Sequence, residues 1–332
     1  MTGIAQTEVF GSTAAGETVT AITLRAGGTR AVILTHGARL QSLYRAGIAH
    51  SLALGSREMA AYEGPLGYCG AVVGPVANRI AAGRFTLDGR SYATDCNEPG
   101  ATLHGGRCGF STRNWHIVAA GESACSLALT QPSGLCGFPG PIGLRVTYAL
   151  AQDGALAIAI QGVAPGDAVL CAPAFHGYWN LDGGADLSGH RLQVAAESML
   201  PVDAAGLPCG APTPVAGSAF DYRIARSPAP DLDHNFCLSP GRVAPREVAR
   251  LSAGSCAMTL ETTEPGLQVY AGGTLDTAPF AGLAGRPYGR NAGIALEPQV
   301  WPDAANHADF PSARLAPGAR YEQHTRFRFA TL

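Results

Sequence analysis

Two short segments of the sequence place a proton-exchanging group among apolar and aromatic neighbours. His176 lies within the run 174–181 (AFHGYWNL), and Glu297 follows the apolar residues 294–296. An imidazole, with an unperturbed pKa near ~6.5, gives and takes protons at neutral pH. Burial of a carboxyl group raises its pKa toward values useful to a general base. Each residue also has a structural interpretation: a satisfied core histidine, and a carboxylate paired with one of the many arginines.

Further polar side chains could bind an oxygen-rich ligand. The fork of donors on an arginine suits such ligands, although an arginine that caps a structural carboxylate is an equally good interpretation. A histidine followed by two glycines lies where the backbone can turn sharply or approach a ligand closely. The candidates are Asn78 and Arg79, which interrupt the apolar, strand-like run 74–80, then His104, Asp233 and Gln268.

Short segments of alternating apolar and polar residues must position these groups, and they predict an all-β protein. Asp88-Gly89 between 85–87 and 90–92 predicts a hairpin with a type I′ turn. A second hairpin is expected from 144–150 and 155–160, around the turn 152–154. Alternation also predicts strands at 191–194 and 326–329. A helical period is weakly present only at 56–62, so helices should be few and short.

Length and composition predict one globular domain over residues 1–332. The chain is 46% hydrophobic and 14% charged, and no linker, repeat or low-complexity tract divides it. The formal charge of -2 gives no basic surface for nucleic acid or an anionic membrane, so neither partner is expected. All 23 basic residues are arginines, which excludes Schiff-base lysines and the P-loop lysine.

Cysteine spacing and the N-terminal residues bear on the compartment. Nine cysteines without a C-x-x-C spacing indicate neither a zinc knuckle nor a full disulfide framework, and predict free buried thiols. Residues 1–24 lack the features of a signal peptide, and no apolar run has the length of a membrane span. A soluble protein in the cytoplasm is therefore expected.

Several motifs in order along nearly the whole chain resemble the aldose 1-epimerases, or galactose mutarotases. The motifs are weak one by one and strong together. They are 74–80 (GPVANRI), 83–85 (GRF), 103–106 (LHGG), 137–140 (GFPG), 146–148 (VTY), 176–181 (HGYWNL), 200–203 (LPVD), 220–223 (FDYR), 233–236 (DHNF), and Glu297 with 302–303, Asn306 and 310–312. Mild departures from the family pattern, at Pro75, Gly177, Trp179 and Pro298, bear on sugar preference more than on chemistry.

The resemblance implies a large antiparallel β-sandwich, the supersandwich of the galactose mutarotase-like fold, with no metal and no organic cofactor. It implies a free aldose as substrate, with Glu297 as the general base at the anomeric hydroxyl and His176 as the general acid at the ring oxygen. Asn78, Arg79, His104, Asp233 and Gln268 would bind the monosaccharide. Either Tyr178 or Trp179 could pack against the C–H face of the sugar. His104 could also donate to the ring oxygen, so its division of work with His176 stays open, as does the choice between monomer and homodimer.

Three alternatives remain at this point. A glycosidase on a similar β-sandwich would need two carboxyl groups, and Asp233 with Glu297 could form such a pair. A non-catalytic carbohydrate-binding protein would account for Arg79 and the aromatic residues, but not for His176 together with Glu297. An enzyme acting on a phosphorylated hexose is less favoured, because Pro75 removes one potential arginine and no other basic cluster is evident in the sequence.

Overall fold

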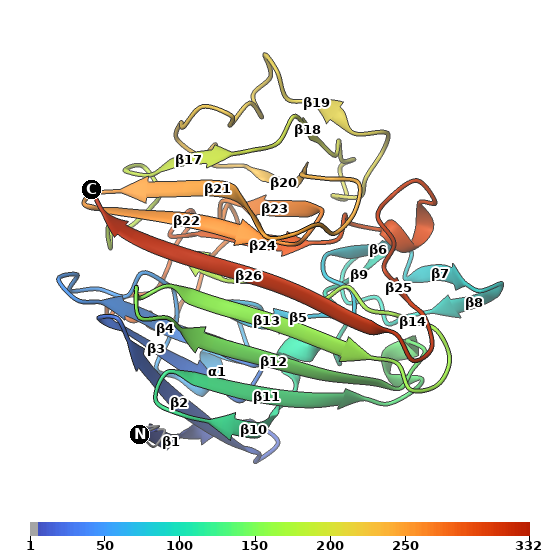
Figure 1. Cartoon of the computed structure of the whole chain (residues 1–332), viewed down its shortest axis with the longest axis horizontal. Coiled ribbons are helices and arrows are strands. Elements are labelled where there is room, and N and C mark those ends of the chain that lie inside the picture. Colours follow the sequence, from blue (N-terminus) through green and yellow to red (C-terminus); the bar gives the residue numbers. More distant parts are fainter. Residues whose placement is uncertain (1–5) are drawn as a thin grey trace.

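The computed structural model describes residues 6–332, and β-strands dominate it (Figure 1). Helical structure in this part of the chain is limited to one four-residue α-helix and three single turns of 3-10 helix. These are α1 (Met59–Tyr62), η1 (Phe110–Thr112), η2 (Leu135–Gly137) and η3 (Ala304–Asn306). The all-β prediction is therefore confirmed, and the weak helical signal at 56–62 corresponds to α1 alone. None of the described helices has the length and apolar character needed to cross a membrane.

An antiparallel eight-stranded sheet forms one layer, with the long C-terminal strand β26 in its interior between β13 and β22 (Figure 1). Its order is β10-β11-β12-β13-β26-β22-β21-β17. The strands are β10 (His116–Ala120), β11 (Ala124–Gln131), β12 (Ile142–Leu150), β13 (Leu156–Val163), β17 (Arg191–Val194), β21 (Arg246–Ala253), β22 (Cys256–Thr262) and β26 (Arg320–Thr331).

The facing layer combines a four-stranded and a six-stranded sheet, ordered β1-β2-β3-β4 and β16-β24-β23-β20-β18-β19. The first contains β1 (Gln6–Ser12), β2 (Thr18–Ala26), β3 (Thr29–Leu34) and β4 (Arg39–Arg45). The second contains β16 (Tyr178–Trp179), β18 (Ser198–Met199), β19 (Thr213–Pro214), β20 (Asp233–Cys237), β23 (Gly266–Tyr270) and β24 (Ile294–Gln299). Four two-stranded ladders complete the fold: β5 (Val72–Val73) with β15 (Ala174–Phe175), β6 (Arg79–Ala81) with β9 (Ala101–Leu103), β7 (Arg84–Leu87) with β8 (Arg90–Ala93), and β14 (Val169–Leu170) with β25 (Arg314–Leu315).

The layers are joined by one large apolar cluster to which all three major sheets contribute. Alternate residues of β12, β13 and β26 are buried, because successive side chains of a strand point to opposite faces. Across the layers, the fully buried ring of Trp179 lies 4.6 Å from that of Phe327, and the Tyr148 hydroxyl donates to the carbonyl oxygen of Ala38 at 2.6 Å. Apolar burial of this kind is the main favourable term in holding two sheets together.

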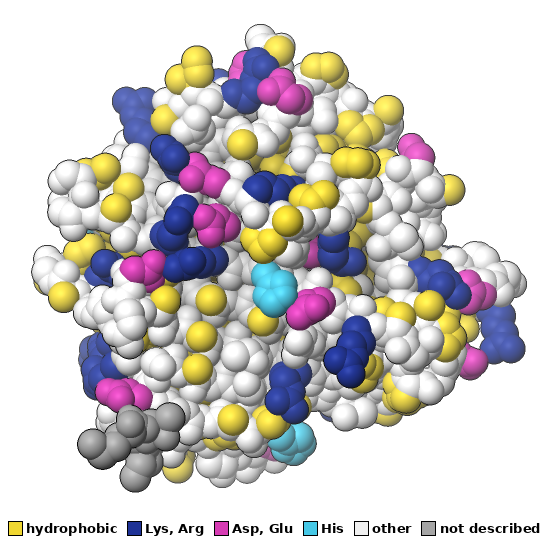
Figure 2. All heavy atoms as spheres, in the orientation of Figure 1, with side chains coloured by type: hydrophobic (Ala, Val, Ile, Leu, Met, Phe, Trp, Pro, Cys, Tyr) yellow, Lys and Arg dark blue, Asp and Glu magenta, His cyan; other side chains and the backbone are white. Residues whose placement is uncertain are grey.

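The outer face of the eight-stranded sheet is polar and mixed in charge. Figure 2 shows basic and acidic side chains interspersed over this side of the molecule. Arg326 pairs with Asp153 at 2.7 Å and Arg328 with Glu261 at 2.5 Å, so neighbouring charges largely neutralise one another. This face therefore presents no single-sign field to a charged partner.

The predicted hairpins form as the turn residues indicate. Asp88 and Gly89 both have positive φ, 49° and 78°, as a type I′ turn requires. β12 pairs with β13 across the turn at 152–154. The strand-like interpretation of 74–80 is wrong, because the chain leaves β5 at Val73, turns at Asn78 with φ of 62°, and begins β6 only at Arg79.

Candidate active site

A cleft of about 510 Å³ brings together all seven residues expected from the sequence to form the site. They come from six separate segments of the facing layer and its ladders, which meet on one face of the six-stranded sheet. The volume is typical of a small-molecule pocket. The lining consists of Pro65, Tyr68, Asn78, Arg79, Glu98, Leu103, His104, His176, Tyr178, Asp233, Gln268, Tyr270, Thr274, Leu275, Asp276 and Glu297.

Strand alternation places the acidic and amide groups on the cleft side of the six-stranded sheet. Leu296 on β24 belongs to the core, so Glu297 next to it faces the opposite side. Gln268 on β23 lies directly opposite Glu297 in the strand register. From the adjacent strand β20, Asp233 accepts a hydrogen bond from Gln268 Nε2 at 2.6 Å. Three strands thus present three hydrogen-bonding groups side by side.

Glu297 and His176 form a buried acid–imidazole pair. His176 Nε2 lies 3.4 Å from Glu297 Oε1, and the side chains are 5% and 2% exposed. Burial, followed by repulsion from Asp233, raises the pKa of Glu297 well above its usual value. Burial, with a smaller contribution from the positive charge of Arg39, lowers the pKa of His176 to about 4. Both shifts keep the pair in an uncharged state that holds one titratable proton.

His176 is positioned by its backbone rather than by its ring. It lies between β15 and β16, donates its amide N–H to the carbonyl of Ala71 and accepts the N–H of Gly70, both at 2.8 Å. Its Nδ1 has no hydrogen-bond partner among the described residues. A buried lone pair without a partner costs less than a buried N–H that has lost its acceptor, so the proton belongs on Nε2, which faces the cleft.

His104 presents a proton donor to the cleft. It follows β9 with φ of 53°, and its Nδ1 accepts the backbone N–H of Asn78 at 3.0 Å. A ring nitrogen that accepts a hydrogen bond carries no proton, so the neutral ring has its proton on Nε2. Burial, followed by the nearby His176, lowers the pKa of His104 well below the usual value and keeps the ring neutral. Gly105 makes the turn possible, because a Cβ there would lie 2.0 Å from the carbonyl oxygen of Gly74.

The same hydrogen bond bears on metal binding. One ligand atom each from His104, His176 and Glu297 lies within 4.8 Å of the others, and two histidines with a glutamate is a zinc-binding set. In His104, however, Nδ1 is engaged by the Asn78 amide and Nε2 carries the proton. The described geometry therefore offers proton donors where a metal would need lone pairs.

Arg79 combines the two interpretations that its sequence context left open. Its guanidinium lines the cleft and also pairs with the carboxylate of Glu98, with Nη2 to Oε2 at 3.3 Å and a closer contact from Nε. The side chains are 19% and 24% exposed, so the pair lies at the rim. The carboxylate holds the arginine fork in position while leaving donors free for a ligand.

Of the two aromatic candidates, Tyr178 lines the cleft and Trp179 does not. Trp179 is fully buried against Phe327 and Phe329 in the core, so the expectation that it could contact a sugar is wrong. Adjacent residues of a strand point to opposite faces, which is why only one of the two can reach the cleft. Tyr178 stacks on the ring of His176 with centroids 5.2 Å apart.

Several lining residues were not anticipated from the sequence. Tyr68 packs against His104 with ring centroids 4.6 Å apart. Glu98 lies within an unremarkable loop, and Tyr270, Thr274 and Asp276 lie at the end of β23 and just beyond it. Their residue types carry no local signal, since only the fold brings these segments to the cleft.

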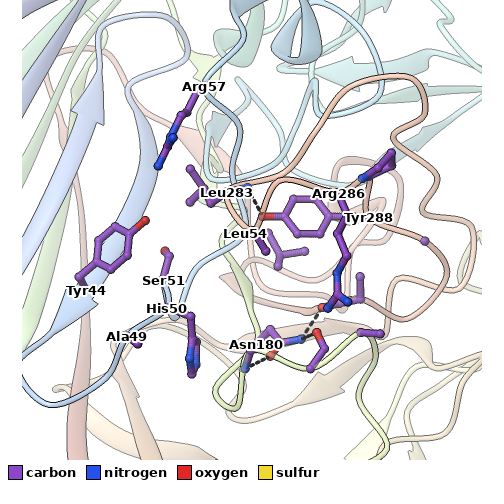
Figure 3. Close-up of a pocket in the computed structure, with 17 residues that line it drawn as sticks. Tyr44, Ala49, His50, Ser51, Leu54, Arg57, Asn180, Leu283, Arg286 and Tyr288 are labelled. Atoms are coloured by element: carbon purple, nitrogen blue, oxygen red, sulfur yellow. Dashed lines mark hydrogen bonds between the residues drawn. The ribbon is translucent and has the colours of Figure 1, made fainter.

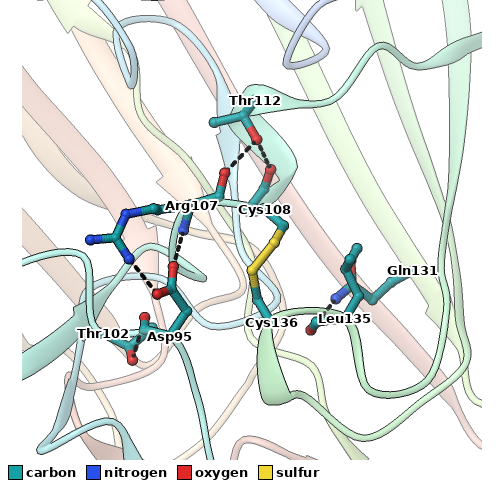
Figure 4. The surroundings of a disulfide bond; sticks show 9 residues. Asp95, Thr102, Arg107, Cys108, Thr112, Gln131, Leu135 and Cys136 are labelled. Atoms are coloured by element: carbon teal, nitrogen blue, oxygen red, sulfur yellow. Dashed lines mark hydrogen bonds and ion pairs between the residues drawn. A yellow bond between two sulfur atoms is a disulfide. The ribbon is translucent and has the colours of Figure 1, made fainter.

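A disulfide tethers the loop that follows His104. The expectation of free buried thiols is confirmed for five cysteines and wrong for the other four; the five are Cys69, Cys125, Cys171, Cys237 and Cys256. Cys108 is bonded to Cys136, and among the free cysteines Cys96 and Cys209 are exposed. Figure 4 shows the disulfide beside the Arg107–Asp95 ion pair, which also anchors this loop. The spacing of 28 residues follows no standard motif, so the sequence did not indicate the pairing.

Removing the disulfide is expected to lower the free energy of unfolding by about 3–4 kcal/mol, the loop-closure entropy for a loop of this length. The test is denaturant unfolding of the Cys108→Ser/Cys136→Ser double variant. Cys96→Ser, at an exposed free thiol, is the control and should unfold like the wild type. Equal stability of the double variant and the control would contradict a stabilising role for the bond.

Comparisons with known proteins all indicate the same family. The sequence model of the aldose 1-epimerase family matches residues 20–328. A galactose mutarotase of Mus musculus is 35% identical over 338 residues, covering 97% of each chain. An aldose 1-epimerase of Escherichia coli is 33% identical over 293 residues, covering 83% of this chain and 84% of its own.

Solved structures show the same fold. An aldose epimerase homologue from C. elegans superimposes with a TM-score of 0.87 at 28% identity, over 94% of this chain and 99% of its own. The galactose 1-epimerase of Lactobacillus acidophilus gives 0.84 at 24% identity, over 98% of both chains. The galactose mutarotase-like sandwich expected from the sequence is therefore confirmed.

Proposed function

This chain belongs to the aldose 1-epimerase family, and we propose that it interconverts the α and β anomers of free aldoses through Glu297 and His176. The observation that carries the proposal is the buried pair itself, with 3.4 Å between His176 Nε2 and Glu297 Oε1 in a polar cleft of about 510 Å³. Anomer exchange moves one proton between two oxygens of a hemiacetal, and the pair holds one titratable proton. The glycosidase and binding-protein alternatives are not favoured by the family.

The reaction follows from the two groups. The reaction proceeds from the form of the pair in which its one titratable proton has passed from Glu297 to His176 across their 3.4 Å contact. The Glu297 carboxylate then takes the proton of the anomeric hydroxyl while protonated His176 gives a proton to the ring oxygen, and the C1–ring oxygen bond breaks. The open aldehyde turns about the bond between C1 and C2. The ring oxygen then attacks the other face of the carbonyl, His176 recovers its proton and Glu297 returns the first one. No electrons are gained or lost, and the starting state is restored.

The remaining polar groups would hold the sugar. Nε2–H of His104 is a fixed donor beside His176, suited to a ring or hydroxyl oxygen. Asp233, oriented by Gln268, is an acceptor for sugar hydroxyls, and Arg79, oriented by Glu98, is a donor. The Tyr178 ring offers a flat apolar surface for C–H groups. Donors and acceptors on separate rigid strands suit a ligand with hydroxyls on every side.

The pH profile of kcat/KM is expected to be a bell with a broad plateau across neutral pH. Activity needs one proton on the pair. The lowered pKa of His176, about 4, means that the second proton binds only in acid, so the acid limb lies near pH 4. The raised pKa of Glu297 means that the last proton is lost well above the usual carboxyl range, which gives the alkaline limb. A profile that falls below pH 6 as an ordinary histidine titrates would contradict the pairing.

Polarimetry tests the activity directly. Freshly dissolved α-D-galactose, α-D-glucose and a pentose are followed with and without the purified protein. The names of the mouse and L. acidophilus relatives make D-galactose the first sugar to test. A faster approach to an unchanged final rotation supports the proposal and ranks the sugars. A folded protein that accelerates none of them would overturn it.

We also propose that residues 1–332 form one domain, because a single apolar cluster joins the three major sheets. Limited proteolysis that yields no stable fragment would support this.

A cytoplasmic location stays a proposal, and the Cys108–Cys136 bond bears against it, since such bonds persist in oxidising compartments. The oxidation state of these two thiols in cells tests the location.

A further inference from the structure

A second hollow, separate from the cleft, lies between the loop after β4 and the loops that flank β16 and β24. It encloses about 420 Å³ and shares no lining residue with the cleft. Its walls come from the loop at 49–57, from 180–185 after β16, and from 283–292 before β24. Figure 3 shows this hollow with Tyr44 on one side and Tyr288 on the other.

The hollow is lined by two arginines and by no carboxylate among the described residues. In Figure 3, Arg57 extends into it from one side and Arg286 from another. Neither arginine takes part in any ion pair found among the described residues. Arg79, which lines the catalytic cleft, is by contrast paired with Glu98.

Two acids lie beside the lining in the sequence, and neither forms an ion pair with Arg57 or Arg286 among the described residues. Glu58, next to Arg57, accepts the backbone N–H of Ala281. Asp182, beside the 183–185 wall, accepts the N–H of Gly184 and lies 3.9 Å from the ring of His190. An anion in the hollow would therefore meet two guanidinium groups that no carboxylate of the lining engages.

The rest of the lining suits a compact organic group. Tyr288 is held firmly, since its hydroxyl donates to the carbonyl of Gly55 and accepts the N–H of Leu283. The amide of Asn180 is satisfied by backbone groups, among them the carbonyl of Ala292 at 2.8 Å. His50 is fixed through Nε2, 3.1 Å from the carbonyl of Leu181. These three side chains are thus held in place, whereas Arg57 and Arg286 have no hydrogen-bond or ion-pair partner among the described side-chain contacts.

We propose that this hollow binds a phosphate monoester of a small metabolite, through Arg57 and Arg286. A phosphate monoester carries a charge of about -1.5 to -2 at neutral pH, which matches two guanidinium groups. Guanidinium forks bind phosphate oxygens in pairs, and the tyrosine rings accept the organic part. The occupant could be a sugar phosphate or a nucleotide, which share this chemistry.

The position of the hollow connects it to the catalytic cleft. The single loop between β23 and β24 contributes Thr274, Leu275 and Asp276 to the cleft and, further on, 283–292 to the hollow. Tyr178 lines the cleft, and its carbonyl accepts the N–H of Leu54, which lines the hollow, at 3.0 Å. A ligand that ties 283–289 to Arg57 would therefore restrain a wall of the cleft without occupying it.

Calorimetric titration of the full chain tests the proposal. The probes are sorbitol 6-phosphate, which has no anomeric centre, adenosine 5′-monophosphate and inorganic phosphate, each with D-galactose in excess so that the cleft stays filled. At least one ester should bind more tightly than inorganic phosphate, and the two esters distinguish a sugar source from a nucleotide source. Binding should weaken as ionic strength rises.

Matched variants assign any binding to the hollow. Arg57→Gln and Arg286→Gln should each weaken ester binding about tenfold or more, the usual loss for a charged hydrogen bond. Arg290→Gln, at an exposed arginine on the same loop but outside the lining, should bind like the wild type. No binding at millimolar ester, affinity no better than that of inorganic phosphate, or equal losses in Arg290→Gln would each overturn the proposal.

Discussion

Replacing Glu297 by glutamine is expected to lower kcat for mutarotation by about 10²- to 10⁴-fold, the usual contribution of a general acid or base. The amide keeps the shape of the side chain and a hydrogen-bonding oxygen, so the cleft should still bind sugar with a similar KM. What it loses is the ability to take and return the anomeric proton. A lower kcat with an unchanged KM would show that Glu297 stabilises the transition state and contributes little to substrate binding.

Stability provides the control for this variant. The folded protein raises the pKa of Glu297, so the wild-type chain loses stability as pH rises from the unfolded carboxyl pKa through the folded one. Glutamine has no such penalty, and the free energy of unfolding of Glu297→Gln at neutral pH should equal or exceed that of the wild type. Glu322→Gln, on the outer sheet face and 54% exposed, should change neither rate nor stability. Near-normal rates in folded Glu297→Gln would remove Glu297 from the mechanism.

Replacing Arg39 by methionine is expected to lower the free energy of unfolding by about 3–5 kcal/mol. Arg39 is fully buried and no carboxylate partner is found among the described residues. Its guanidinium instead donates to backbone carbonyls, and it lies 4.5 Å above the centre of the Tyr62 ring. The acceptors are the carbonyls of Leu66 and Gly67, both at 2.9 Å, Ser111 at 3.3 Å, and Cys69. Methionine fills similar space but leaves these buried acceptors without donors.

The same change should reach the active site, because the segment that Arg39 holds carries Tyr68, which packs against His104. Denaturant unfolding and polarimetry at a temperature where the variant stays folded measure the two effects. Arg39→Lys retains the charge but not the fork, and should fall between wild type and Arg39→Met. Arg25→Met, at an exposed arginine on β2, should stay within about 0.5 kcal/mol of the wild type. If Arg39→Met is as stable as Arg25→Met, the hydrogen bonds from Arg39 to the buried carbonyls do not contribute to stability.

Local chemistry accounts for the parts of the fold that the sequence predicted. The Asp88-Gly89 turn and the hairpin of β12 with β13 depend on residues within 20 positions of one another, Gly143 and Val163 being the most distant pair. Alternation along β26 needs only neighbouring residues, since a strand repeats every two. The run at 74–80 was misjudged because its apolar composition conceals the left-handed conformation of Asn78. That conformation is stabilised by a distant contact, the hydrogen bond to His104.

The sequence by itself determined that the protein is all-β, which family it resembles, and seven side chains that line the cleft. Only the tertiary structure decided their states: the shifted pKa values of Glu297 and His176, the proton on Nε2 of His104, and the choice of Tyr178 over Trp179. It also brought Arg57 and Arg286 to one hollow, although 229 positions separate them (286 minus 57). The physical reason is the distance along the sequence between the groups that interact. Strand alternation and turns follow from adjacent residues, whereas burial, tautomer and local charge depend on groups that only the folded chain brings into contact.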